Sequence, residues 1–127
     1  MTEHYDAIVI GAGQAGPSLA ARLGQEGLKT AIIERHRIGG TCVHTGCIPT
    51  KTLVASARVA YLSRRAAEYG VTIDTPVSVD MARVKARKDE IVAASNAGLT
   101  AWVEDMENVT LIRGHARFED PRSISVN

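Results

Sequence analysis

A glycine-rich turn near the N-terminus constrains the fold more than any other feature of this sequence. Gly11, Gly13 and Gly16 form the pattern G-x-G-x-x-G, directly after the apolar run YDAIVI at residues 5–10. The run is rich in β-branched residues, which predicts a buried parallel strand, and residues 14–26 follow with apolar side chains at helical spacing. A strand, a glycine turn and a helix in this order predict a dinucleotide-binding α/β unit.

Each glycine of this turn has its own physical task. The first allows the tight turn, the second lets a pyrophosphate approach the backbone, and the third lets the helix pack closely on the strand. Unpaired N–H groups at the start of the helix attract the phosphates. We therefore expect the whole turn to bind a dinucleotide, through Gly11, Ala12, Gly13, Gln14, Ala15 and Gly16. The alternative is a glycine turn that only packs a helix against a strand.

The second expected strand, TAIIE at residues 30–34, ends on a carboxylate. Glu34 follows Gly13 by 21 residues, and an acidic residue about 20 residues after the glycines holds a ribose hydroxyl in dinucleotide-binding folds. An acid at this position favours NAD or FAD over NADP. Arg35 and Arg37 lie beside it, so this preference is incomplete, and Arg35 is expected to join the cofactor site.

The rest of the chain continues the alternation of helices and strands. The further expected elements are a helix over residues 50–69, a helix from a cap at Asp80 to about Met106 that could break near Gly98, a strand over residues 109–114 and a hairpin over residues 115–127. We therefore expect an α/β, Rossmann-like domain with a parallel sheet over residues 1–127. Its C-terminal β-meander is expected to be incomplete at residue 127.

Charge and hydropathy exclude several classes of function. The net charge is +1, which gives no general attraction to nucleic acid or anionic lipid. No apolar run approaches membrane-spanning length, and the N-terminus lacks the layout of a secretory signal. We therefore expect a cytoplasmic protein without nucleic-acid or membrane partners. In a reducing compartment, a static structural disulfide would be unusual.

The two cysteines of the chain, Cys42 and Cys47, lie close together in the segment GGTCVHTGCIPTK. In a regular helix, residues five apart are separated by about 7.5 Å along the axis and point about 140° apart, whereas a disulfide needs Cα atoms within about 7 Å. A bridge therefore requires a distorted turn, which Gly46 and Pro49 can provide. The start of the following helix, together with Lys51, would stabilise a thiolate there.

Three hypotheses can explain this pair of cysteines. A zinc site could recruit His44 and another histidine, but the spacing matches no common zinc motif and His4, His36 and His115 are scattered. Two inert buried cysteines are the second hypothesis. A redox-active dithiol is the third, and the position beside a nucleotide-binding unit favours it, so we predict no metal site.

These motifs together resemble a known family. GAGQAG, the acid at residue 34 and GGTCVHTGCIPTK are similar to the N-terminus of the class I, FAD-dependent pyridine nucleotide-disulfide oxidoreductases, which include dihydrolipoamide dehydrogenase, glutathione reductase and mercuric reductase. The segment TCVHTGCIPTKTLVASARVAYLSRRAAEYGV is most similar to mercuric reductases and their relatives. The resemblance covers nearly the whole chain. It implies that the first nucleotide unit binds FAD and that NAD(P)H is a co-substrate bound by a later domain.

The resemblance also implies roles for particular residues. Cys42 would be the interchange thiol that attacks the substrate, and Cys47 would lie against the flavin and form the charge-transfer complex. The other implied cofactor contacts are Lys51 near the flavin ring, Gly40 and Thr41 near the pyrophosphate, and His115 and Ala116 at the adenine. His44 stands where the family usually has asparagine. It could stabilise a thiolate or accept a proton, or it could be an exposed turn residue.

The family requires more chain than these motifs account for. Its members carry a nicotinamide-binding domain, a later stretch that completes the flavin site, and a C-terminal dimerisation domain with a His-Glu pair. Since none of these is recognisable in residues 1–127, we expect the N-terminal part of a longer, homodimeric enzyme, inactive by itself. The full enzyme would reduce a small-molecule disulfide or a metal ion. The alternative is a flavin-binding module without turnover.

Overall fold

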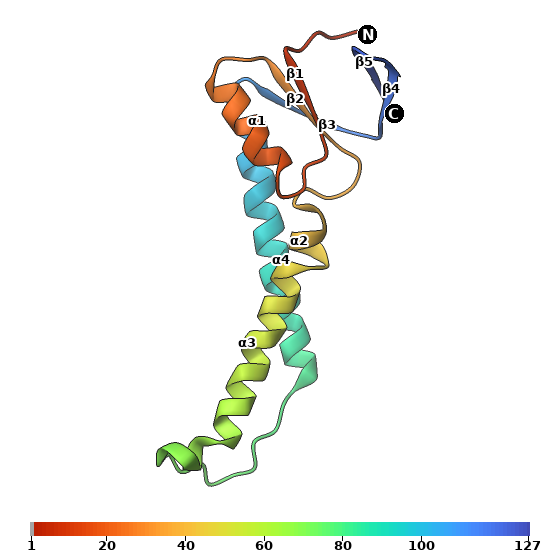
Figure 1. The fold of residues 1–127 in the computed structure, drawn as a ribbon. Helices are drawn as coiled ribbons and strands as arrows, with labels where there is room; N and C mark the ends of the chain where they lie inside the picture. Colours follow the sequence, from red (N-terminus) through yellow and green to blue (C-terminus); the bar gives the residue numbers. More distant parts are fainter. Residues whose placement is uncertain (1) are drawn as a thin grey trace.

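The computed structural model describes residues 2–127 as a small parallel sheet from which a pair of long helices extends (Figure 1). In chain order, the elements are β1 (Ala7–Ile10), α1 (Gly16–Gln25), β2 (Thr30–Glu34), α2 (Gly40–His44), α3 (Cys47–Arg64), the 3₁₀ helix η1 (Ala66–Tyr69), α4 (Met81–Glu104), β3 (Val109–Arg113), β4 (Ala116–Asp120) and β5 (Ser123–Val126). This alternation confirms an α/β, Rossmann-like fold.

The parallel sheet has the strand order β1-β2-β3, with β2 in the middle. Ile32 of β2 pairs with Val9 on one side and with Leu111 on the other. The first four residues of β2 are buried, as expected for a strand covered on both faces of a parallel sheet. The carboxyl ends of the three strands meet at one edge, which is where ligands bind in open α/β sheets.

The hydrophobic core lies between this sheet and the helices α1 and α4. Its buried members are Val9, Ala12, Ala20, Ile32, Ile38 and Val103. Ala12 and Ala20 are fully buried, and their small side chains let α1 approach the sheet closely. Burial of the larger apolar side chains stabilises the fold by about 1.5–3 kcal/mol each.

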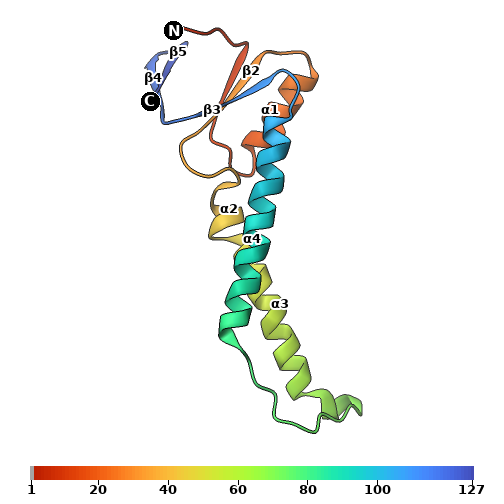
Figure 2. The ribbon, with the colours of Figure 1, turned by 180° about the vertical axis from the view of Figure 1, so that it is seen from behind.

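Helices α3 and α4 pack against each other and run away from the sheet (Figures 1 and 2). Asp80 caps α4 as predicted, since its side chain accepts a hydrogen bond from the backbone N–H of Arg83 at 3.0 Å. Large apolar side chains along this pair are exposed, among them Val59, Tyr61 and Met81. None of the helices described over residues 2–127 has the length and apolar character needed to cross a membrane.

Several predicted boundaries require correction. The strand expected from residue 5 begins at Ala7, and the helix expected from residue 14 begins at Gly16. The helix expected over residues 50–69 begins at Cys47 and ends at Arg64, and the 3₁₀ helix η1 follows it. The possible break near Gly98 does not occur, because α4 is continuous. A single glycine costs a helix only about 1 kcal/mol, which the packing of a long helix can outweigh.

Candidate functional site

The glycine turn between β1 and α1 has the shape that dinucleotide binding requires. Gly11 has φ +97°, a conformation that favours glycine, and its N–H donates to the carbonyl of Ile33 at 2.7 Å. A Cβ atom on Gly16 would lie 2.0 Å from the carbonyl oxygen of Gly11, so this position has no room for a side chain. A Cβ atom on Gly13, in contrast, would meet no protein atom within 4 Å. The turn is therefore packed on its inner side and open at Gly13.

A large pocket of about 990 Å³ opens at the carboxyl ends of the sheet strands, beside the glycine turn. Its volume is at the upper end of the range for ligand pockets, which is about 300–1,000 Å³. The lining residues are Ile10, Gly11, Gly13, Ile33, Glu34, Arg35, His36, Arg37, Gly40, Thr41, His44, Thr45, Gly114, His115 and Ala116. They come from the ends of β1, β2 and β3 and from α2. The topology thus gathers segments that are far apart in the sequence around one cavity.

Glu34 holds the glycine turn to the end of β2. Its Oε2 atom accepts from the backbone N–H of Ala12 at 2.8 Å, and its Oε1 atom accepts from the N–H of His36 at 2.8 Å. Partial burial by itself would raise the pKa of this carboxyl group. Hydrogen bonds from the backbone N–H groups of Ala12, His36 and Arg35 outweigh that effect, and the pKa is lowered from its ordinary value. The group is therefore an ionised acceptor at neutral pH.

The cationic side of the pocket lies next to Glu34. Arg35, His36 and Arg37 follow it directly and all line the cavity. The guanidinium of Arg35 approaches Nδ1 of His115 at 3.5 Å. The positive charge suits a ligand that carries phosphates.

The two cysteines form a disulfide in a short turn between α2 and α3. Their Cα atoms are 4.6 Å apart, inside the distance that a disulfide needs. The helix breaks at Thr45 and Gly46, and Gly46 has φ −117° and ψ −107°. We call residues 42–47 the dithiol turn. The predicted distorted turn is confirmed, although α3 begins at Cys47 itself rather than after it.

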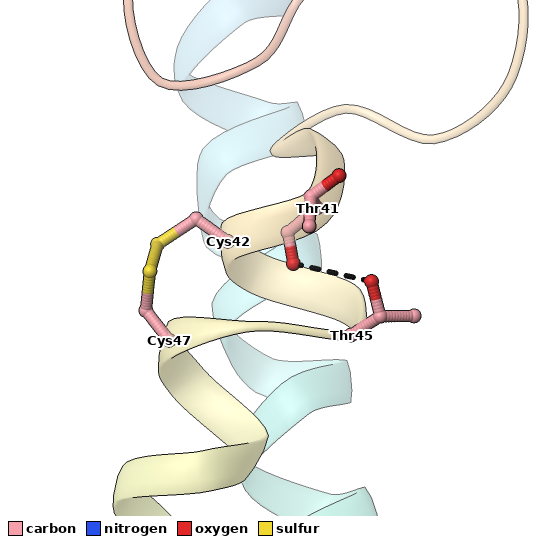
Figure 3. The surroundings of a disulfide bond; sticks show 4 residues. All are labelled: Thr41, Cys42, Thr45 and Cys47. Carbon is pink, nitrogen blue, oxygen red and sulfur yellow. Dashed lines mark hydrogen bonds between the residues drawn. A yellow bond between two sulfur atoms is a disulfide. The ribbon is translucent and has the colours of Figure 1, made fainter.

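Local hydrogen bonds hold the dithiol turn together. The carbonyl oxygen of Thr41 accepts from the backbone N–H of Thr45 at 2.9 Å and from that of Gly46 at 2.6 Å. The hydroxyl of Thr45 donates to the same oxygen at 3.4 Å, on the side of the turn opposite to the disulfide (Figure 3). The two threonines line the large pocket, whereas the sulfur atoms lie outside it.

The surroundings of the two cysteines differ. Cys42 is half-buried, whereas Cys47 is exposed and is the first residue of the 18-residue helix α3. Lys51 is four residues further along α3, and residues at this spacing share one face of a helix. Both the start of the helix and the nearby ammonium group favour negative charge at Cys47.

The predicted cofactor residues divide into two groups in the structure. Gly11, Gly13, Glu34, Arg35, Gly40, Thr41, His115 and Ala116 line the pocket. Ala12, Gln14, Ala15, Gly16, Lys51 and Cys47 are outside the lining set. Ala12 and Gly16 are buried beneath the turn, while Gln14, Ala15 and Lys51 are exposed. The first group therefore faces the cavity, whereas cofactor contacts from Gln14, Ala15, Cys47 and Lys51 stay predictions.

Several residues of the pocket were not predicted as cofactor contacts. Ile10 is the last residue of β1, Ile33 is the penultimate residue of β2, and both line the pocket. The other lining residues outside the predicted cofactor set are His36, Arg37, His44, Thr45 and Gly114. His36 and Arg37 could have been predicted as pocket residues, because they follow the carboxyl end of a parallel strand. Asn96, in the middle of α4, donates to the carbonyl of Ile38, and no sequence signal connects these two residues.

The residues present fit a dinucleotide cofactor such as FAD. An open position at Gly13, a cationic rim and an ionised acid at the end of β2 match the pyrophosphate and ribose of such a cofactor. A Cβ atom on Gly40 would lie 3.1 Å from Cα of Gly13, so α2 also approaches the turn closely. Across residues 2–127, no group of three or more His, Cys, Asp or Glu side chains is arranged to hold a metal ion.

The fold and the site define a dinucleotide-binding α/β domain with a disulfide beside its pocket. Residues 5–126 match the family described as pyridine nucleotide-disulphide oxidoreductase. The chain belongs to this family.

The relatives include dihydrolipoyl dehydrogenases. That of Rhizobium etli is 38% identical over 126 residues, which cover 99% of this chain and 26% of the relative. That of Chlamydia muridarum is 40% identical over 126 residues, which cover 99% of this chain and 27% of the relative. The chain therefore spans about a quarter of the length of these proteins.

Solved structures show the same relationship. The Cu(II) complex of the HOCl-induced flavoprotein disulfide reductase RclA from Escherichia coli superimposes with a TM-score of 0.80 at 34% identity. The match covers 99% of this chain and 25% of RclA. The particular similarity to mercuric reductases stays a prediction.

Proposed function

We propose that this chain forms the FAD-binding and disulfide-bearing part of an enzyme that passes electrons from NAD(P)H to a small-molecule disulfide. The observation that carries the proposal is the position of the Cys42–Cys47 disulfide. Helix α2 contributes Gly40, Thr41 and His44 to the pocket and Cys42 to the disulfide. A cofactor held at the glycine turn would therefore end close to the dithiol turn.

The chain's own residues would act as follows. Glu34 binds the ribose, the N–H groups at the start of α1 and the open backbone at Gly13 bind the pyrophosphate, and Lys51 lies near the ring. The bound flavin supplies two-electron transfer from the nicotinamide to the disulfide. Two electrons and two protons convert the Cys42–Cys47 disulfide into two thiols.

The reduced pair then transfers these electrons by thiol–disulfide exchange. The Cys42 thiolate attacks one sulfur of the substrate disulfide, forms a mixed disulfide and releases the other half as a thiol. Cys47 next attacks the sulfur of Cys42, which releases the second substrate thiol and restores the internal disulfide. The start of α3 stabilises Cys47 as a thiolate for this step. A disulfide that opens in each cycle suits the reducing cytosol.

An anaerobic titration of the full-length protein tests the proposal. The protein should purify yellow, or gain flavin on incubation with FAD, and addition of NADH or NADPH should expose two new alkylatable thiols at Cys42 and Cys47. A colourless protein that gains no flavin removes the proposal. Bound flavin without any new thiols would instead establish the alternative, a flavin-binding module without turnover.

A metal ion is the second candidate acceptor. The observation that favours it is the similarity to RclA, whose structure has been solved as a Cu(II) complex. Steady-state assays with a disulfide and with Cu²⁺ or Hg²⁺ distinguish the two acceptors.

We further propose that the full-length protein is a homodimer, on the basis of the family resemblance. Sedimentation analysis of that protein tests this.

A further inference from the structure

The peptide group between Ile38 and Gly39 lies in the segment that leads from β2 to α2. Both its carbonyl and its N–H group make hydrogen bonds. The carbonyl oxygen of Ile38 accepts from Nε2 of His44 at 2.9 Å and from Nδ2 of Asn96 at 2.8 Å. The N–H of Gly39 donates to the carbonyl of Ala12 at 2.7 Å. Ile38 is 1% exposed, so water has little access to this peptide. One buried peptide group thus connects the glycine turn, α2 and α4.

The chemistry of this contact determines the state of His44. A carbonyl oxygen only accepts hydrogen bonds and has two lone pairs, which the two side chains fill. Nε2 of His44 therefore carries a proton, and the imidazole is held in one orientation. The two donors lie 3.3 Å apart because both point at the same oxygen. The His44 side chain therefore donates a hydrogen bond to the Ile38 carbonyl and does not simply point into solvent.

The dithiol turn needs support from outside itself. Helix α2 has five residues, far fewer than the roughly 12–15 that an isolated helix needs for marginal stability. While the disulfide is intact, it adds a second covalent link between α2 and α3 beside the backbone at Thr45 and Gly46. When the disulfide opens, the short backbone between the cysteines still connects them, but only hydrogen bonds and packing hold Cys42 in its orientation toward Cys47. Asn96 belongs to the long helix α4, 58 residues from Ile38, and it supplies an anchor that does not depend on the disulfide.

We propose that Asn96 is a positioning residue for the Cys42–Cys47 pair. Together with His44, it holds the Ile38 carbonyl and so keeps α2 in place when the disulfide opens. The two thiols then stay within reach of each other, and their high effective concentration favours closure of the disulfide. This inference rests on the proposed function, in which the pair opens and closes in each cycle.

The expected effect is a shift in the thiol–disulfide equilibrium. Replacement of Asn96 by Ala removes one of two donors, and the equilibrium constant for closure of Cys42–Cys47 against glutathione should fall about two- to tenfold, as for loss of one hydrogen bond. Asn96→Asp keeps the shape but replaces the donor by an acceptor, so it should lower the constant at least as much. Removing both donors, in His44→Ala with Asn96→Ala, should lower it by more than the product of the single effects, because the buried carbonyl then has no partner.

The experiment uses the full-length, FAD-loaded protein in a series of glutathione redox buffers. Alkylation followed by mass spectrometry of the Cys42 and Cys47 peptides gives the closed fraction at each ratio of reduced to oxidised glutathione. Ser95→Ala is the matched control, since Ser95 precedes Asn96 on α4 and its side chain makes no hydrogen bond to the dithiol turn in the described part of the chain. Circular dichroism of each variant checks the fold, and Ser95→Ala should match the wild-type constant.

The possible outcomes separate this inference from the proposed function. If Asn96→Ala or Asn96→Asp keeps the wild-type equilibrium constant, or if Ser95→Ala lowers it equally, Asn96 has no positioning role. A wild-type protein whose cysteines form no reversible disulfide in these buffers would overturn the proposed function and this inference with it. A reversible wild-type disulfide with unchanged Asn96 variants would overturn the inference alone.

Discussion

The Oε2 atom of Glu34 accepts a hydrogen bond from the backbone N–H of Ala12 at 2.8 Å. These residues are 22 positions apart in the sequence, one at the end of β2 and the other inside the glycine turn. The carboxylate that is expected to bind a ribose therefore also holds the loop that is expected to bind the pyrophosphate. The cofactor site is in part formed before any ligand enters it.

Replacement of Glu34 by Gln should weaken this connection in a pH-dependent way. The pKa of Glu34 is lowered in the folded protein, so its contribution to stability is present above the pKa of the unfolded state and is lost as the pH falls through the folded-state pKa. Glu34→Gln should unfold more easily at neutral pH, by about 1 kcal/mol, with a smaller difference in acid. Urea denaturation of the full-length protein at several pH values measures this. A difference that stays constant into acid would contradict it.

Replacement of Gly16 by Ala should destabilise the fold itself. The new Cβ atom would lie 2.0 Å from the carbonyl oxygen of Gly11, and backbone rather than a flexible side chain would have to move. We expect a loss of about 1–3 kcal/mol in the free energy of unfolding, measured by urea denaturation. Gly98→Ala is the matched control, because its Cβ atom meets nothing within 4 Å in the middle of α4. That variant should gain about 0.5–1 kcal/mol.

Replacement of Gly13 by Ala should separate binding from stability. No protein atom lies within 4 Å of the new Cβ atom, so the free energy of unfolding should change by less than about 0.5 kcal/mol. The methyl group would occupy the space into which a pyrophosphate approaches the backbone. Affinity for FAD should therefore fall about tenfold or more, or about 1.4 kcal/mol, as measured by fluorescence titration of the flavin-free protein. Unchanged affinity would place the pyrophosphate elsewhere.

The two cysteines should differ when each is replaced by serine. In the reduced full-length enzyme, Cys47→Ser should lose the long-wavelength absorbance of a thiolate beside the flavin. Cys42→Ser should keep that band, because Cys47 at the start of α3 remains, but it should no longer reduce a disulfide substrate. Anaerobic absorbance spectra and a turnover assay test both statements. Identical spectra for the two variants would contradict the assigned roles.

Much of the fold and part of the site were predictable from the sequence, for a physical reason. Glycines, caps and hydrophobic periodicity act locally, and they predicted the strand at residues 30–34 with both ends correct and the cap at Asp80. The glycine turn and Glu34 were predictable because their spacing along one strand–helix–strand unit determines their separation in space. The cysteine pair required a distorted turn on geometric grounds, and Gly46 provides it.

Tertiary structure decided what depends on contacts between distant segments. The continuity of α4 through Gly98 follows from the stability of a 24-residue helix, which local propensity underestimates. His115 and Arg35 share the pocket because β3 pairs with β2. Asn96 meets the Ile38 carbonyl because α4 folds back along α2. The sequence by itself therefore determined the local elements and the chemistry of the motifs. Packing of α4 against α2 decided that Asn96 meets the Ile38 carbonyl, since no pattern along the chain records a contact across 58 residues.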